Sequence, residues 1–165
     1  MMGAGKTTTG RMVAAQLACP FVDLDEMLER ASNMSVTNIF ATYGQRGFRE
    51  MERRALLEVL ADSSERVLAV GGGTPVQPGL MDALLGASRV FWLRCSAKIL
   101  ARRVMRDGLD KRPLVAACVT DEEVEAALSA RLAERCAVYA RAHDVVDVGE
   151  RDSALAIAMR IVSRL

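Results

Sequence analysis

The sequence predicts an α/β fold in which helices cover both faces of a parallel sheet. A wholly apolar run at 67–70 and a second strand-like segment at 89–93 alternate with segments whose apolar residues recur with helical spacing. That alternation is typical of parallel strands joined by helices. The 165 residues contain no repeat, low-complexity tract or linker, so we expect residues 1–165 to form one domain.

The first 62 residues are expected to hold four helices and one extended segment. Pro20 ends the first helix because proline cannot continue it, and Gly44 separates two later ones. The last helix of this part is long and amphipathic. The predicted helices are 6–18, 25–31, 35–43 and 46–62, and the extended segment is 21–25.

The remaining residues are expected to add three strands and four helices. The apolar run at 67–70 ends in three glycines, as a buried parallel strand ending in a loop does. The stretch 107–120 lacks helical periodicity and contains Gly108 and Pro113, so we expect a loop. The predicted strands are 67–70, 89–93 and 145–148, and the predicted helices are 79–86, 96–106, 121–142 and 152–164.

The composition is that of an ordinary globular protein. Lys plus Arg is 22 and Asp plus Glu is 21, so the net charge of +1 gives no reason to expect a nucleic-acid or membrane partner. The four cysteines are far apart without a CxxC pair, and there is one histidine, so we expect reduced thiols and no zinc site. The N-terminus does not resemble a secretory signal, so we expect a cytoplasmic protein. We also expect a monomer.

The first motif that carries chemistry is a phosphate loop. Residues 3–8 match the second half of the pattern G-x-x-x-x-G-K-[ST], whose backbone N–H groups surround phosphates at a helix N-terminus. Lys6 would bridge the β- and γ-phosphates of ATP, and the Thr7 hydroxyl would ligate Mg²⁺. A chance match in a flexible tail is disfavoured because an apolar helix starts directly afterwards. The expected nucleotide contacts are Gly3, Ala4, Gly5, Lys6, Thr7 and Thr8.

The beginning of this pattern falls before Met1. Its first glycine, and the strand that normally leads into the loop, are not in these 165 residues. That strand lies inside the sheet, so its loss would leave ladder hydrogen bonds unmatched on both neighbours. We therefore expect a natural chain that starts several residues upstream, and a poorly folded short chain. The alternative is a truncated, inactive nucleotide-binding module.

Two acids lie at the end of the predicted extended segment 21–25. Asp23 and Asp25 alternate, so on a strand they would share one face. At the carboxyl end of a parallel strand this pair suits a metal-bound water and a substrate hydroxyl. The alternative is that Asp25 merely caps a helix.

Two arginines suggest an anionic substrate. Arg49 and Glu52 are three residues apart on one helical face and can pair, although exposed pairs of this kind contribute little. Arg135 supplies a second guanidinium, and two converging guanidiniums bind a carboxylate in bidentate fashion. Taken alone, Arg135 on a charged helix is more typical of a solvated side chain.

Two further segments are predicted to belong to the same site. Gly71, Gly72 and Gly73 follow an apolar strand, and three glycines favour a place where a ligand approaches the backbone closely. A plain tight turn rarely needs all three. Arg112 lies within the loop 107–120, where a mobile lid would bring an arginine to the transferring phosphoryl group.

Taken together, the order and spacing of these motifs resemble shikimate kinase. The resemblance covers nearly the whole chain through MGAGKTT, DLD, SVTNIFATYGQRGFREME, VGGG, KRPL and RCAVY. It implies a P-loop kinase fold with a five-stranded sheet of order 2-3-1-4-5, in which the absent strand is the central one. It also implies ATP-dependent phosphorylation of the 3-hydroxyl of shikimate, on the route to aromatic amino acids. A related gluconate kinase is the alternative enzyme.

The resemblance also assigns roles to residues. It implies that Asp23 serves the Mg²⁺ shell through water and that Asp25 holds substrate hydroxyls and acts as general base. The family's adenine-stacking arginine could be Arg103 or Arg106, and the spacing leaves this choice open. The remaining implied contacts are Arg49 and Arg135 for the substrate carboxylate, Gly71, Gly72 and Gly73 for the substrate, and Arg112 for the lid.

Overall fold

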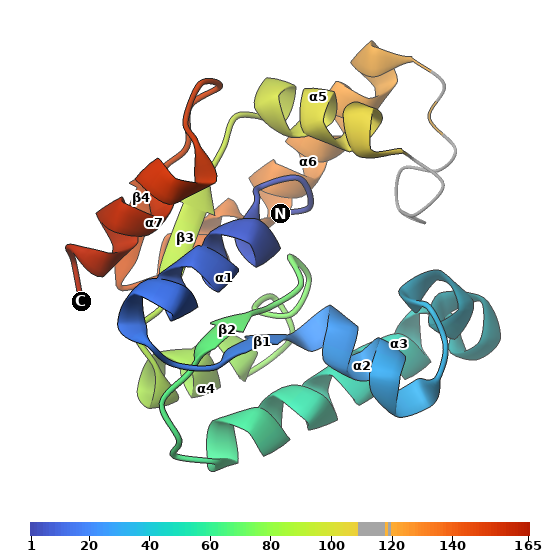
Figure 1. Ribbon diagram of the computed structural model, residues 1–165. Coiled ribbons are helices and arrows are strands. Elements are labelled where there is room, and N and C mark those ends of the chain that lie inside the picture. The colour runs from blue at the N-terminus through green and yellow to red at the C-terminus, as the bar shows by residue number, and fades with distance from the viewer. Residues whose placement is uncertain (109–117, 119) are drawn as a thin grey trace.

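The computed structural model describes residues 1–108, 118 and 120–165 (Figure 1). Within these residues helices and short strands alternate along most of the chain, as the sequence predicts. The elements are α1 (Lys6–Leu17), β1 (Phe21–Asp23), α2 (Leu24–Ser32), α3 (Val36–Ala61), β2 (Val67–Ala69), α4 (Leu80–Ala87), β3 (Phe91–Arg94), α5 (Ala97–Asp107), α6 (Asp121–Tyr139), β4 (Asp144–Asp147) and α7 (Ala154–Val162).

The strands form two parallel pairs. β1 pairs with β2, from Phe21 opposite Val67 to Asp23 opposite Ala69. β3 pairs with β4 in the same parallel sense. α1 lies between the pairs and contacts both β1 and β2 as well as α7 (Figure 1). The predicted parallel arrangement is therefore present, but among the described residues it consists of two short ladders and not of one continuous sheet.

Two apolar cores accompany the two strand pairs. In the first core α1, α5, α6 and α7 pack around β3 and β4, and in the second α2, α3 and α4 pack beside β2. Neighbouring residues of β2 contribute to different cores, because Val67 packs against the first and Leu68 against the second. A strand with apolar neighbours on both faces explains the uninterrupted apolar run that the sequence shows at this point.

Helix starts follow local capping chemistry. Thr120 and Glu123 form a capping box at the N-terminus of α6, which begins at Asp121 as predicted. Ser96 and Ser153 accept hydrogen bonds from the backbone N–H groups of Ile99 and Ala156 and so cap α5 and α7. These side chains satisfy N–H groups that would otherwise lack partners.

Several predicted boundaries were wrong. The extended segment predicted over 21–25 ends at Asp23, because this residue caps α2. The helices predicted over 35–43 and 46–62 are continuous apart from Gly44, whose φ of 67° and ψ of 177° interrupt the helical conformation. The helix predicted over 121–142 ends at Tyr139, and a turn follows. None of the helices within residues 1–108 and 120–165 is long and apolar enough to cross a membrane.

Candidate active site

The phosphate loop leaves the N-terminus of α1 open to a ligand. Gly3 and Gly5 adopt positive φ values of 71° and 83°, which glycine tolerates without strain. Gly5 is the N-cap residue and supplies no side-chain hydrogen bond, and the first turn contains no acidic residue. Among the described residues no N-cap side chain closes this helix start, where the positive end of the helix dipole lies. This arrangement fits a bound phosphate.

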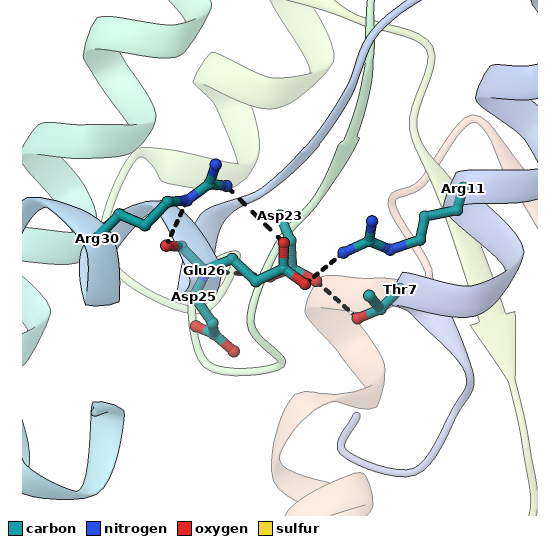
Figure 2. A network of polar contacts seen from close by, with 6 residues as sticks. All are labelled: Thr7, Arg11, Asp23, Asp25, Glu26 and Arg30. Carbon is teal, nitrogen blue, oxygen red and sulfur yellow. Dashed lines mark hydrogen bonds and ion pairs between the residues drawn. The ribbon is translucent and has the colours of Figure 1, made fainter. Parts of the chain in front are cut away.

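Lys6 and Thr7, at the start of this helix, form hydrogen bonds with different parts of the chain. The Lys6 Nζ donates to the carbonyl oxygen of Met1 at 3.0 Å. The Thr7 hydroxyl donates to Oδ2 of Asp23 at 2.6 Å (Figure 2). A hydroxyl beside a carboxylate offers the hard oxygen ligands that Mg²⁺ takes together with phosphate oxygens and water, so these two residues fit the ion. Thr8 is exposed, and Ala4 is buried beneath the loop.

The Asp23 and Asp25 pair is not arranged as the strand periodicity predicts. Asp23 ends β1, whereas Asp25 lies in the first turn of α2. Oδ1 of Asp23 accepts a hydrogen bond from the backbone N–H of Asp25 at 3.0 Å, so Asp23 is the helix cap and the alternative that assigned this role to Asp25 is wrong. The two carboxylates are nevertheless neighbours, joined through this cap (Figure 2).

The surroundings of Asp25 change its acidity. Burial raises the pKa of Asp25 to about 6, the negative charges of Asp23 and Glu52 act in the same direction, and the charge of Lys6 opposes them. A carboxylate with a pKa close to physiological pH accepts a proton more readily than an ordinary aspartate, as a general base requires.

The triple-glycine loop approaches several side chains too closely for any other residue. A methyl group on Gly71 would lie 2.8 Å from Oε1 of Glu52 and 3.5 Å from Oδ1 of Asp25. A methyl group on Gly73 would lie 2.3 Å from Nη2 of Arg49. None of the three glycines has a positive φ, so close approach is what requires them. The sequence predicts such an approach by a ligand, which stays a prediction, and the structure shows protein side chains making a close approach.

Arg49 and Glu52 form a buried pair and not the surface pair that their spacing alone suggested. The Glu52 side chain is 0% exposed and that of Arg49 is 21% exposed, and Nη1 of Arg49 bonds to Oε2 of Glu52. The guanidinium also lies over the ring of Phe48, with Cζ 5.3 Å from the ring centroid. A buried pair of this kind is costly to break from one side.

Arg135 and Tyr139 approach the glycine loop from α6. The Tyr139 hydroxyl donates to the carbonyl oxygen of Gly72, and it lies 3.5 Å from Sδ of Met1. Nη1 of Arg135 lies 3.7 Å from the same sulfur, so Arg135 is not a fully solvated side chain. Burial raises the pKa of Tyr139, while the charges of Arg135 and Arg49 oppose that rise, which puts both guanidiniums near one phenol.

The structure describes the two candidates for the adenine contact but not the lid arginine. Arg112 lies outside the described residues, as does most of the predicted loop 107–120. Nη1 of Arg103 lies 3.4 Å from the carbonyl oxygen of Gly3 and so contacts the phosphate loop, whereas Arg106 is exposed beside Asp107. The adenine contact itself stays a prediction for both arginines.

Sequence reasoning gave no role to Thr74, Gln77 and Tyr139, which line this region, and gave Glu52 only a pairing with Arg49. Glu52, Thr74 and Gln77 form a cluster under Arg49, and Tyr139 bonds the glycine loop. Tyr139 could have been found from its position four residues after Arg135, because that spacing puts both on one helical face. Nothing in the sequence connects Glu52 to residues more than twenty positions away.

Comparison with known proteins gives a consistent result. The family model for shikimate kinase matches residues 2–165. A shikimate kinase of Novosphingobium aromaticivorans is 42% identical over 118 residues, which is 70% of this chain and 60% of that protein. A shikimate kinase of Mesorhizobium japonicum is 34% identical over 165 residues, covering 100% of this chain and 77% of that protein. The structure of shikimate kinase from Acinetobacter baumannii in complex with shikimate superimposes with a TM-score of 0.88 at 31% identity, over 99% of this chain and 87% of that one.

Proposed function

Because this chain belongs to the shikimate kinase family, we propose that it transfers the γ-phosphoryl group of ATP to the 3-hydroxyl of shikimate, giving shikimate 3-phosphate and ADP. This reaction is a step in the biosynthesis of aromatic amino acids. The bond between the γ-phosphorus and the β,γ-bridging oxygen breaks, and a bond from the γ-phosphorus to the substrate oxygen forms. The proton of the hydroxyl passes to a base.

The phosphate loop would hold the nucleotide. Its first-turn N–H groups and Lys6 are suited to the β- and γ-phosphates, because α1 begins without a side-chain cap. Thr7 would hold Mg²⁺ directly and Asp23 through water, and the ion would neutralise charge on the phosphate oxygens. Arg112 would neutralise further charge when the segment 107–120 covers the nucleotide.

The other half of the site would hold shikimate. Asp25 is proposed to bind a ring hydroxyl and to accept its proton, since burial raises the pKa of this carboxyl to about 6. Arg49 and Arg135 would bind the carboxylate, and Gly71, Gly72 and Gly73 would lie against the ring.

The observation that carries this proposal is the convergence of separate elements on the triple-glycine loop. Asp25 comes from α2, Arg49 from α3 and Tyr139 from α6, and each has an atom within 3.5 Å of where a methyl group on one of these glycines would lie. Arg135 is one turn before Tyr139 on α6. Asp23 connects this cluster to Thr7 of the phosphate loop. An acidic group beside two guanidiniums suits a hydroxy acid, because the hydroxyl can bond to the acid while the substrate carboxylate accepts hydrogen bonds from the guanidiniums.

A coupled assay of ADP release tests the assignment. The protein should consume ATP with shikimate and act far more slowly with gluconate or a nucleoside monophosphate. Rates with gluconate equal to those with shikimate would overturn the choice of substrate.

We also propose finer features of the fold and location. Residues 1–165 would form one domain in which the two strand pairs are the outer parts of a single sheet of order 2-3-1-4-5. In support, β2 and β3 each have a ladder partner on one side only among the described residues. The four free cysteines, Cys19, Cys95, Cys118 and Cys136, support a reducing compartment such as the cytoplasm.

A further inference from the structure

We propose that Thr74 and Gln77 are positioning residues, which hold the Glu52 carboxylate and through it fix the guanidinium of Arg49 for binding the substrate carboxylate. This inference rests on the function proposed above and adds two residues to which that function assigned no role. They follow the triple-glycine loop, in the turn between β2 and α4.

Every oxygen of the Glu52 carboxylate has a donor. The Thr74 hydroxyl donates to Oε1. Oε2 accepts from Nη1 of Arg49 and, at 2.7 Å, from Nε2 of Gln77. The Glu52 and Thr74 residues are both 0% exposed, so neither is in contact with bulk solvent.

Because the Glu52 carboxylate is buried, it needs hydrogen-bond donors from the protein. A buried charge is tolerated only where it is paired and hydrogen-bonded, and one counter-ion leaves acceptor sites unfilled. Thr74 and Gln77 fill them from a segment that is itself folded tightly, since the N–H of Thr74 donates to Gly71 at 3.1 Å and that of Gln77 to Thr74 at 3.2 Å. The glycine loop and the glutamate of α3 therefore hold each other in place.

Arg49 is consequently held on three sides. Nη1 is bonded to Glu52, Nη2 lies where a side chain on Gly73 would stand, and the ring of Phe48 lies beside the guanidinium. Bidentate binding of a carboxylate needs the fork in one orientation. If Glu52 shifts, the fork rotates and the substrate affinity falls, while the nucleotide site is untouched.

The test compares Gln77→Ala and Thr74→Val with the wild-type protein in steady-state kinetics. We expect the KM for shikimate to rise about 5- to 20-fold, with kcat and the KM for ATP within about 2-fold, because a hydrogen bond to a charged group has been lost. Thr74→Ser keeps the hydroxyl and should restore the wild-type KM. Gln16→Ala and Thr42→Val change the same residue types at exposed helix positions and should alter nothing.

Two results would overturn the inference. One is an unchanged KM for shikimate in both variants, and the other is an equal rise in the KM values for shikimate and ATP, which indicates general loosening. If Thr74→Val does not melt cooperatively, Gln77→Ala decides alone, because Gln77 is only partly buried. Failure of the proposed function would appear differently, as a wild-type protein that does not phosphorylate shikimate.

Discussion

Replacing Asp25 by asparagine should inactivate the protein and stabilise it at the same time. The substitution keeps the size of the side chain and removes its charge. Turnover with shikimate should fall by ~10² or more, because an amide neither accepts the proton nor holds the hydroxyl as a carboxylate does. The KM for ATP should stay within about 2-fold of the wild type.

The stability change follows from the pKa of Asp25. Burial raises it from 3.8 to about 6, so the ionised form is disfavoured in the folded protein. That difference corresponds to roughly 3 kcal/mol, which partial exposure reduces to ~1–2 kcal/mol. The folded pKa lies above the unfolded one. The contribution of Asp25 to the free energy of unfolding is therefore fully present below the ordinary pKa of 3.8 and is lost as the pH rises through about 6. The asparagine side chain of the variant cannot ionise, so the variant escapes that loss.

Urea unfolding at two pH values measures this effect. At pH ~7.5 Asp25→Asn should be more stable than the wild type by ~1–2 kcal/mol, and at pH ~4 the difference should nearly vanish. Asp82→Asn is a matched control, since Asp82 is also a first-turn acid but is exposed on α4 and pairs with Arg141. Unchanged turnover would remove Asp25 from the mechanism, and an equal stability gain at both pH values would refute the pKa argument.

Three further predictions concern other parts of the site and fold. Arg135→Lys keeps the charge but loses the planar fork, so the KM for shikimate should rise roughly 10-fold with little change in the KM for ATP; a collapse in ATP affinity would assign Arg135 to the nucleotide instead. Gly73→Ala puts a methyl group 2.3 Å from Nη2 of Arg49, so it should raise the KM for shikimate and lower stability by ~1–3 kcal/mol; kinetics and melting equal to wild type would contradict the packing. If a strand belongs between β2 and β3, a chain extended by ~10 upstream residues should melt more cooperatively and release more ADP than residues 1–165 alone, and equal behaviour of the two would refute the proposed sheet order.

Local chemistry made much of the fold predictable. Pro20 and the capping box of Thr120 and Glu123 mark helix ends through interactions between near neighbours, and these ends were predicted within a residue or so. Asp25 shows the limit of this reasoning. Its alternation with Asp23 predicts a strand, but the cap formed by Asp23 starts a helix one residue after the strand ends.

The site was predictable where a motif carries its own geometry. The phosphate loop is of this kind, because Gly5 and Lys6 both belong to one turn at a helix start. The surroundings of Glu52 were not predictable in this way. Its carboxylate is hydrogen-bonded by Thr74 and Gln77, which lie 22 and 25 residues away in sequence. Spacing alone indicates an exposed helix pair with Arg49, and only tertiary packing reveals it as a buried one.

Asp23 limits how this protein could be redesigned. One carboxylate serves two elements, since Oδ2 bonds to Thr7 at the start of α1 and Oδ1 caps the helix that carries Asp25. A substitution at this position disturbs Thr7 and the helix of Asp25 together, so under the proposed roles it could not alter acceptor preference separately from nucleotide use. If Arg49 and Arg135 bind the substrate carboxylate as proposed, variation toward a new hydroxy acid has to come from them and their supports, with residue 23 kept constant.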